Sequence, residues 1–203
     1  MKKRIFTALL SVMMILTLIT PAHGAYRSVG MVTVSDIESL LQAIDQANDG
    51  DTIFIDNTIV VRAETGNLFI GDADKHITLM RADGFNGGLF YVADVGNNHT
   101  LFNNLTIDGN SIMAHSSAIT INGIARFDNV NFINHITVSQ GAAIQILRTT
   151  VRFQNCYFSN NQALDGGHIR VEPNGGIYMH SSTLYPLNQK TAHQSIIKTI
   201  ETR

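Results

Sequence analysis

The chain repeats one short pattern of apolar and polar positions three times. The copies read LFNNLTI, RFDNVNF and RFQNCYF, and they begin at Leu101, Arg126 and Arg152. Within each copy apolar residues alternate with polar ones, as expected of a strand with one buried face. Because the copies recur at steps of 25 and 26 residues, the pattern predicts a solenoid in which each turn of the chain packs on the turn before it.

Comparison of the copies indicates three strand faces in each turn. An isoleucine column marks the first face, a phenylalanine column marks the second, and the strand that follows a recurrent asparagine forms the third. We expect the apolar residues to lie inside and the asparagines to form sharp corners, because asparagine tolerates a left-handed backbone. The predicted structural columns are Ile119, Ile144 and Ile169, then Phe102, Phe127 and Phe153, then Asn104, Asn129 and Asn155.

A helix is predicted ahead of these strands, at residues 34–50. Ser35 and Glu38 have the spacing of a capping box, an apolar face follows at helical spacing, and Gly50 is a typical C-terminal stop. We expect this helix to cover the first end of the stack, where a strand edge would otherwise be exposed. Short β-rich runs at 52–55, 59–61, 77–80 and 89–92 predict the first strands.

The first residues have the pattern of a secretory signal peptide. Lys2, Lys3 and Arg4 precede an apolar stretch, and small residues follow near position 24. We therefore expect a secreted protein at the cell surface or associated with an outer membrane, and no transmembrane span in the mature chain. The predicted organisation is a signal peptide at 1–24, an N-terminal cap with the helix at 25–50, a parallel β-helix at 51–185, and a C-terminal tail or cap at 186–203.

Charge and cysteine content narrow the classes of partner. The formal net charge is −2 and the basic residues are scattered beyond the first four positions, so we expect no nucleic acid partner. Cys156 is the one cysteine in the chain, which excludes a disulfide framework within it. Since Cys156 occupies the position of Leu105 and Val130 in the other copies, we interpret it as a small buried apolar residue.

Two segments resemble known β-helix proteins. The run SDIESLLQAIDQANDGDTIFI from Ser35 to Ile55, together with the rung LFNNLTIDGN from Leu101, is similar to the pectate lyase-like superfamily. The run FSNNQALDGGHI from Phe158 resembles the repeat of chlamydial-type polymorphic outer membrane proteins, and the copy before it is degenerate. These resemblances imply an all-β fold, a right-handed parallel β-helix of about five coils with an N-terminal capping helix.

The superfamily resemblance implies that an enzyme would use the outer side of the first face. Asp165, Arg170 and Glu172 are the catalytic candidates there, for a calcium-dependent lyase or a glycoside hydrolase. The alternative is a solvated surface, which we favour because the position outside the first face reads Thr120, Gln145 and then Arg170. We expect no cofactor, and Ca²⁺ only if the protein is a lyase.

Other polar residues suggest binding rather than catalysis. Arg126 and Arg152 repeat outside the second face and can grip an anionic group, or can pair with acidic neighbours such as Asp128. Gln145 and His168 are further binding candidates outside the first face, where we also expect Ala118 and Ala143 to point outward. We interpret the histidines of the turns as solvated residues and not as metal ligands: His115, His135, His168 and His180.

Three hypotheses for function follow. The first is an exported, non-catalytic β-helix, a surface or adhesin-like module that binds a glycan or a surface protein. The second is a small polysaccharide lyase or glycoside hydrolase of the pectate lyase-like superfamily. The third is a truncated N-terminal fragment of a larger surface protein.

Overall fold

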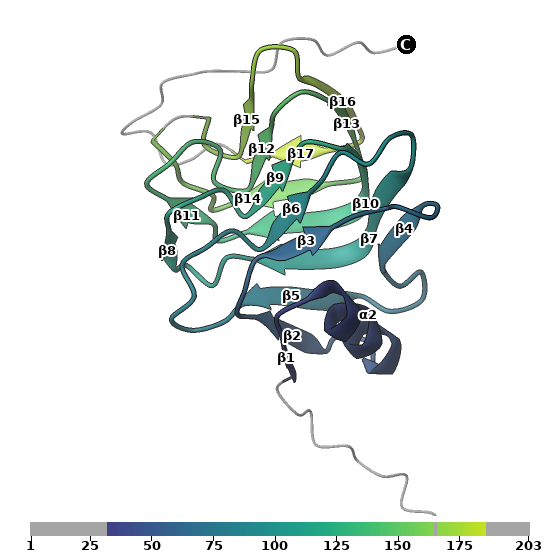
Figure 1. Ribbon diagram of the computed structural model, residues 1–203. Helices are drawn as coiled ribbons and strands as arrows, with labels where there is room; N and C mark the ends of the chain where they lie inside the picture. The colour runs from purple at the N-terminus through teal and green to yellow at the C-terminus, as the bar shows by residue number, and fades with distance from the viewer. Residues whose placement is uncertain (1–31, 165, 186–203) are drawn as a thin grey trace, which may run out of the picture. The chain divides into compact units, whose positions relative to one another are not determined.

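The computed structural model describes residues 32–164 and 166–185. In this part of the chain, short parallel strands stack into a β-solenoid of about five turns, with one short helix near its first strand (Figure 1). The predicted fold class, an all-β parallel β-helix with an N-terminal helix, is confirmed. The predicted signal peptide at 1–24, the predicted tail at 186–203 and Asp165 lie outside the described residues.

The first face is a five-stranded parallel sheet built from one strand of each turn. Its isoleucine column is in register, with Ile119 opposite Ile144 and Ile144 opposite Ile169. In chain order the strands are β3 (Ile59–Val61), β6 (Phe90–Val92), β9 (Ile119–Ile121), β12 (Ile144–Ile146) and β15 (Ile169–Val171).

The second and third faces form one long parallel sheet of ten strands. Its main path runs through β1 (Val32–Val34), β2 (Thr52–Ile55), β5 (Ile77–Arg81), β7 (His99–Asp108), β10 (Ile124–Ile133), β13 (Thr150–Gln154) and β16 (Gly176–His180). Beside this path lie β4 (Leu68–Gly71), which pairs with β7, β14 (Tyr157–Ser159), which pairs with β10, and β17 (Thr183–Leu184), which pairs with β14.

The asparagine corners bend this sheet without interrupting it in β7 and β10. Asn104, Asn129 and Asn155 have left-handed φ values of 54°, 54° and 53°, as predicted. Asn129 Nδ2 donates a hydrogen bond to Asn104 Oδ1 at 2.7 Å. We predicted separate strands on either side of each corner, but β7 and β10 are single ten-residue strands that pass through it. One left-handed residue turns the chain while the strand pairing resumes immediately beyond it.

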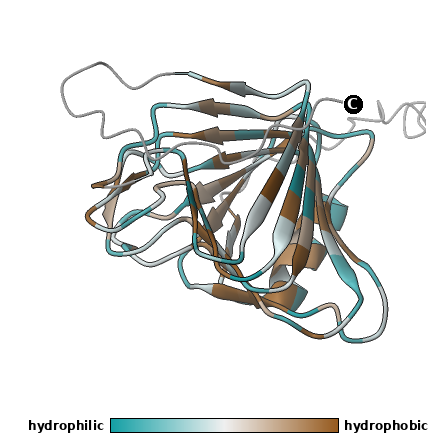
Figure 2. Cartoon of the chain, turned by 90° about the horizontal axis from the view of Figure 1, so that it is seen from above, coloured by the Kyte–Doolittle hydropathy of each residue, from teal (hydrophilic) through white to brown (hydrophobic). Residues whose placement is uncertain are grey.

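The core contains a continuous phenylalanine column. The ring centroids of Phe102 and Phe127 lie 4.8 Å apart, those of Phe127 and Phe153 lie 5.2 Å apart, and both pairs are stacked. All three side chains are 0–1% exposed. Apolar and polar residues alternate along the strands, as Figure 2 shows in a view turned by 90°. The central ring, Phe127, is therefore covered by an equivalent ring on either side, as the repeat predicted.

Helix α2 (Ile37–Gln46) packs on the first turn through Leu40 and Ile44. The predicted capping box at Ser35 and Glu38 is wrong by one residue. Asp36 is the N-cap, its side chain accepts a hydrogen bond from Ser39 N at 2.8 Å, and Ser39 Oγ accepts one from Asp36 N. Both pairs have suitable spacing, but only Asp36 combines an extended backbone with this reciprocal bonding.

The two ends of the stack differ from the prediction in detail. The helix ends at the C-cap Ala47, before Gly50, and Lys75 Nζ donates hydrogen bonds to carbonyls of its last turn. The strand β1, which the pattern did not predict, pairs with β2 at the first end. At the other end, β15, β16 and β17 pair on one side only among the described residues.

The turns between the third and first faces fold inward. They contain a short two-stranded sheet of β8 (Met113–Ala114) and β11 (Ile136–Thr137). Ala118 and Ala143 are 0% exposed, so the prediction that they point outward is wrong. These small residues pack against the core, where each turn meets the first face.

Candidate functional site

The outer side of the first face brings together three of the predicted site residues. Gln145 on β12 and Arg170 on β15 are neighbours in register, and both approach the Glu172 carboxylate. Gln145 Nε2 donates to Glu172 Oε1 at 3.1 Å, and Arg170 Nε lies 3.5 Å from the same oxygen. The Glu172 side chain is therefore already paired with a cation and an amide, which suits a structural contact.

Among the described residues, the outward column of the first face holds no carboxylate that could pair with Glu172 as a glycosidase requires. In register along the first face, the outward positions before Arg170 are Val60, Tyr91, Thr120 and Gln145. Asp165, the predicted partner of Glu172, lies outside the described residues. Within the described ranges, no group of three or more His, Cys, Asp or Glu side chains is placed to hold a metal ion.

His168 does not share the hydrogen-bond partner of Gln145. Its Nδ1 accepts a hydrogen bond from Asn161 Nδ2 at 3.1 Å, and its Nε2 donates to the Tyr185 carbonyl at 2.5 Å. Burial lowers the pKa of His168 below its usual range, while the Tyr185 bond opposes that shift. Its partners are thus a buried asparagine and the end of the last turn, so His168 braces the fold there.

His135 is not the solvated turn residue that we predicted. Only 1% of it is exposed, and its Nε2 lies 3.0 Å from the Ile107 carbonyl. Burial lowers its pKa to about 3, and the positive charge of Arg81 adds to the effect. Its backbone N–H donates to the buried Asn161 Oδ1 at 3.0 Å. The imidazole is therefore a neutral part of the core in this turn.

Cys156 is buried as predicted. Its thiol is 2% exposed, and burial raises its pKa to about 11. A thiol that is buried and protonated at neutral pH is neither a nucleophile nor a metal ligand. The residue therefore packs as a small apolar side chain of the third face.

Arg126 and Arg152 are direct neighbours outside the second face. Arg126 Nη2 lies 3.5 Å from Asp128 Oδ2 and donates to Gln154 Oε1 at 3.1 Å. The Arg126–Asp128 pair is the acidic pairing that we predicted as the alternative to ligand binding. Arg152 instead lies over the ring of Tyr178, 5.7 Å from its centroid, and no carboxylate pairs with it among the described residues.

The two arginines belong to a longer set, which we call the outer row. It consists of one outward side chain from each of five neighbouring strands, in register: Phe69, Leu101, Arg126, Arg152 and Tyr178. Sequence reasoning missed three of these residues, although Leu101 and Tyr178 continue the steps of 25 and 26 residues. Phe69 had no such signal, because it precedes Leu101 by 32 residues.

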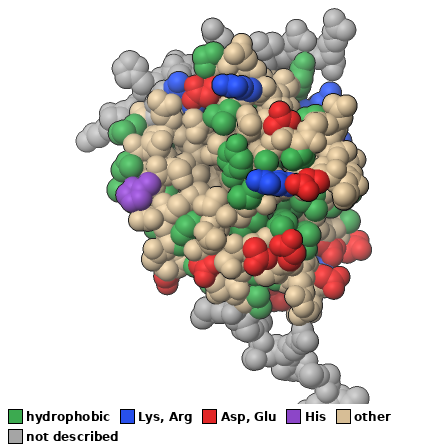
Figure 3. Space-filling model, viewed as in Figure 1, with side chains coloured by type: hydrophobic (Ala, Val, Ile, Leu, Met, Phe, Trp, Pro, Cys, Tyr) green, Lys and Arg blue, Asp and Glu red, His purple; other side chains and the backbone are tan. Residues whose placement is uncertain are grey.

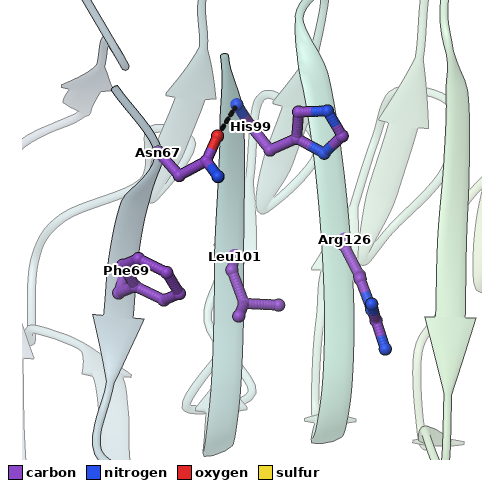
Figure 4. Close-up of a pocket in the computed structure, with 5 residues that line it drawn as sticks. All are labelled: Asn67, Phe69, His99, Leu101 and Arg126. Carbon is purple, nitrogen blue, oxygen red and sulfur yellow. Dashed lines mark hydrogen bonds between the residues drawn. The ribbon is translucent and has the colours of Figure 1, made fainter. Parts of the chain in front are cut away.

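A shallow pocket of about 130 Å³ lies at the first end of the outer row. Figure 4 shows Phe69, Leu101 and Arg126 side by side on three neighbouring strands, with Asn67 and His99 next to them. Asn67 Oδ1 accepts a hydrogen bond from the His99 backbone N–H at 2.9 Å. A pocket of this size is smaller than a typical small-molecule site, so it suits one small group of a larger ligand.

The fold and this surface together define the protein as a parallel β-helix with a mixed aromatic and cationic outer row. Comparison of the chain with protein-family models, curated proteins and solved structures finds no match to any of them. In the part of the chain that the structure describes, no helix has the length and apolar character needed to cross a membrane.

Proposed function

We propose that this chain is an exported, non-catalytic β-helix protein, a surface or adhesin-like module that binds a partner protein or a glycan. The observation that supports the proposal most is the outer row, whose two aromatic ends are exposed by 59% at Phe69 and 49% at Tyr178. Exposed aromatic residues that flank arginines are typical of binding surfaces, and packing of the fold does not require them.

The proposal includes secretion of the protein and its relationship to known families of β-helix proteins. The signal-peptide pattern at 1–24 supports secretion, with the mature protein at the cell surface or associated with an outer membrane. The solenoid and its repeats support a distant relationship to the pectate lyase-like superfamily. The run from Phe158 supports a likeness to the repeats of chlamydial-type polymorphic outer membrane proteins.

The arrangement of the first face argues against an enzyme. A lyase needs several carboxylates around Ca²⁺ and a free base, and an inverting glycosidase needs two separated carboxylates. Glu172 is held by Gln145 and Arg170, and the positions one and two coils before it carry Leu147 and Asn122. Among the described residues, Glu172 therefore has no second carboxylate in its column with which to share a proton transfer.

The test combines an activity assay with a binding assay on the mature chain. The protein is incubated with pectate, alginate and polygalacturonate, with and without Ca²⁺, while unsaturated products and new reducing ends are recorded. We expect no products, and saturable binding to at least one of five probes: poly-glutamate, a glutamate–tyrosine copolymer, polygalacturonate, dextran sulfate and neutral dextran. Products at catalytic rates, or no binding to any probe, would contradict the proposal.

A further inference from the structure

The outer row lies on a rigid support. Leu101, Arg126 and Arg152 each stand directly before a ring of the phenylalanine column in the sequence. Phe69 and Tyr178 stand before Ile70 and Met179, which continue the same register. Successive side chains therefore point alternately to solvent and to the stacked core. With strands about 4.8 Å apart, the row from Phe69 to Tyr178 covers four steps, or about 19 Å. A ligand on this surface meets side chains at fixed and regular spacing.

The positive charge of the outer row lies at its two arginines, Arg126 and Arg152. The Arg126 guanidinium forms an ion pair with Asp128 and a hydrogen bond with Gln154. Arg152 instead has an aromatic neighbour and no acidic one among the described residues. Acidic side chains instead gather around the end that holds α2, as Figure 3 shows. An acidic ligand is therefore attracted to the middle of the row, where it finds an arginine without a carboxylate.

The apolar residues of the outer row indicate that its ligand also carries apolar side chains. Leu101 and the exposed Phe69 form the wall of the pocket beside Arg126, and Tyr178 extends the apolar surface beyond Arg152. Aromatic residues and arginine dominate the binding energy of protein–protein contacts. Nucleic acid binding depends on many phosphate contacts, and two arginines are too few for it. The combination fits a polypeptide with both acidic and apolar side chains.

We propose that the outer row docks an acidic segment of a partner protein, an inference that rests on the proposed binding function. A carboxylate of that segment pairs with Arg152, and an apolar or aromatic side chain packs between Phe69 and Leu101. A second carboxylate binds Arg126 in competition with Asp128. The segment lies across the strands, because the arginines and the aromatic residues follow one another along the solenoid axis.

The experiment measures binding of the labelled glutamate–tyrosine copolymer to the mature chain by fluorescence anisotropy. The test variant combines Arg126→Gln with Arg152→Gln. The control combines Arg62→Gln with Arg148→Gln, two exposed arginines outside the row, and so removes the same charge. We expect the test variant to bind at least about tenfold more weakly, and the control to bind like the unmodified chain. Phe69→Ser should also weaken copolymer binding, and more than it weakens binding of poly-glutamate.

The alternatives give different results. Equal weakening in the test variant and the control would mean that net charge alone drives binding, and would overturn the proposal. Tighter, arginine-dependent binding of dextran sulfate or polygalacturonate would identify a glycan as the occupant; the protein partner would then be wrong while the proposed binding function stands. Probe binding that none of the row variants affects would place the binding surface elsewhere. Equal circular dichroism spectra of the variants exclude loss of folding as the cause.

Discussion

Truncation of the central ring in the phenylalanine column tests the fold most directly. Phe127 is 0% exposed and is stacked between Phe102 and Phe153, with Phe132 at its edge. Phe→Ala changes in cores cost about 3–5 kcal/mol, and each aromatic pair adds about 0.5–1.5 kcal/mol beyond its buried area. We therefore expect Phe127→Ala to cost about 5 kcal/mol, near the upper end of that range.

The assay is equilibrium urea unfolding followed by circular dichroism. Phe69→Ala is the matched control, because its side chain is 59% exposed and its loss should cost less than about 0.5 kcal/mol. Domains of this kind are stable by about 5–15 kcal/mol, so Phe127→Ala can unfold the protein. Phe127→Leu, expected to cost about 1–2 kcal/mol, keeps the test measurable. A cost at position 127 no larger than that at position 69 would refute the stacked column.

Three further predictions concern single residues. Asn129→Ala should cost about 1–2 kcal/mol more than Asn129→Gly in urea unfolding, because alanine is strained at a φ of 54°; equal costs would contradict the strain argument. Stability should fall as the pH drops from about 6.5 towards 3, because the lowered pKa of His135 makes the unfolded chain bind more protons; the loss is on the order of 4–5 kcal/mol. Urea midpoints at pH 7 and pH 4 check this, and His135→Asn should reduce the difference. Cys156, buried with a raised pKa, should react with a thiol reagent only after unfolding, and fast labelling of the native protein would refute its burial.

The repeat made the core predictable because identical neighbours must bury one another. A residue such as Phe127 contacts its equivalents directly, so sequence spacing and spatial contact coincide. The asparagine corners were predictable for a similar reason, since few residues other than glycine adopt a left-handed backbone at low cost. The helix was predicted in the right part of the chain, but the bounds 34–50 were too wide, because Val34 belongs to β1 and the helix ends at Gln46. Its cap was also misplaced, because Ser35 and Asp36 both begin pairs with suitable spacing.

The surface features were less predictable because they depend on the irregular turns. His135 looked like a solvated turn residue, but its turn folds against the core and removes it from water. Phe69 joins the outer row only because β4 pairs with β7 across an insertion that breaks the repeat. Such features follow from how loops of different length close, and the spacing of equivalent residues carries no information about them.

The phenylalanine column and the outer row lie on opposite sides of the same strands. A change in the column therefore affects the row, whereas a change in the row has little effect on the column. Arg126 precedes Phe127 and Arg152 precedes Phe153, so the spacing of the two arginines is set by the stacking of the two rings. A change in the column alters that spacing and also lowers stability. A change in the row leaves the buried rings in place, since Arg126 contributes only a partly exposed ion pair, which is worth little. The outward residues of the solenoid can therefore change without loss of the fold, while the inward residues remain fixed by their neighbours in the stack.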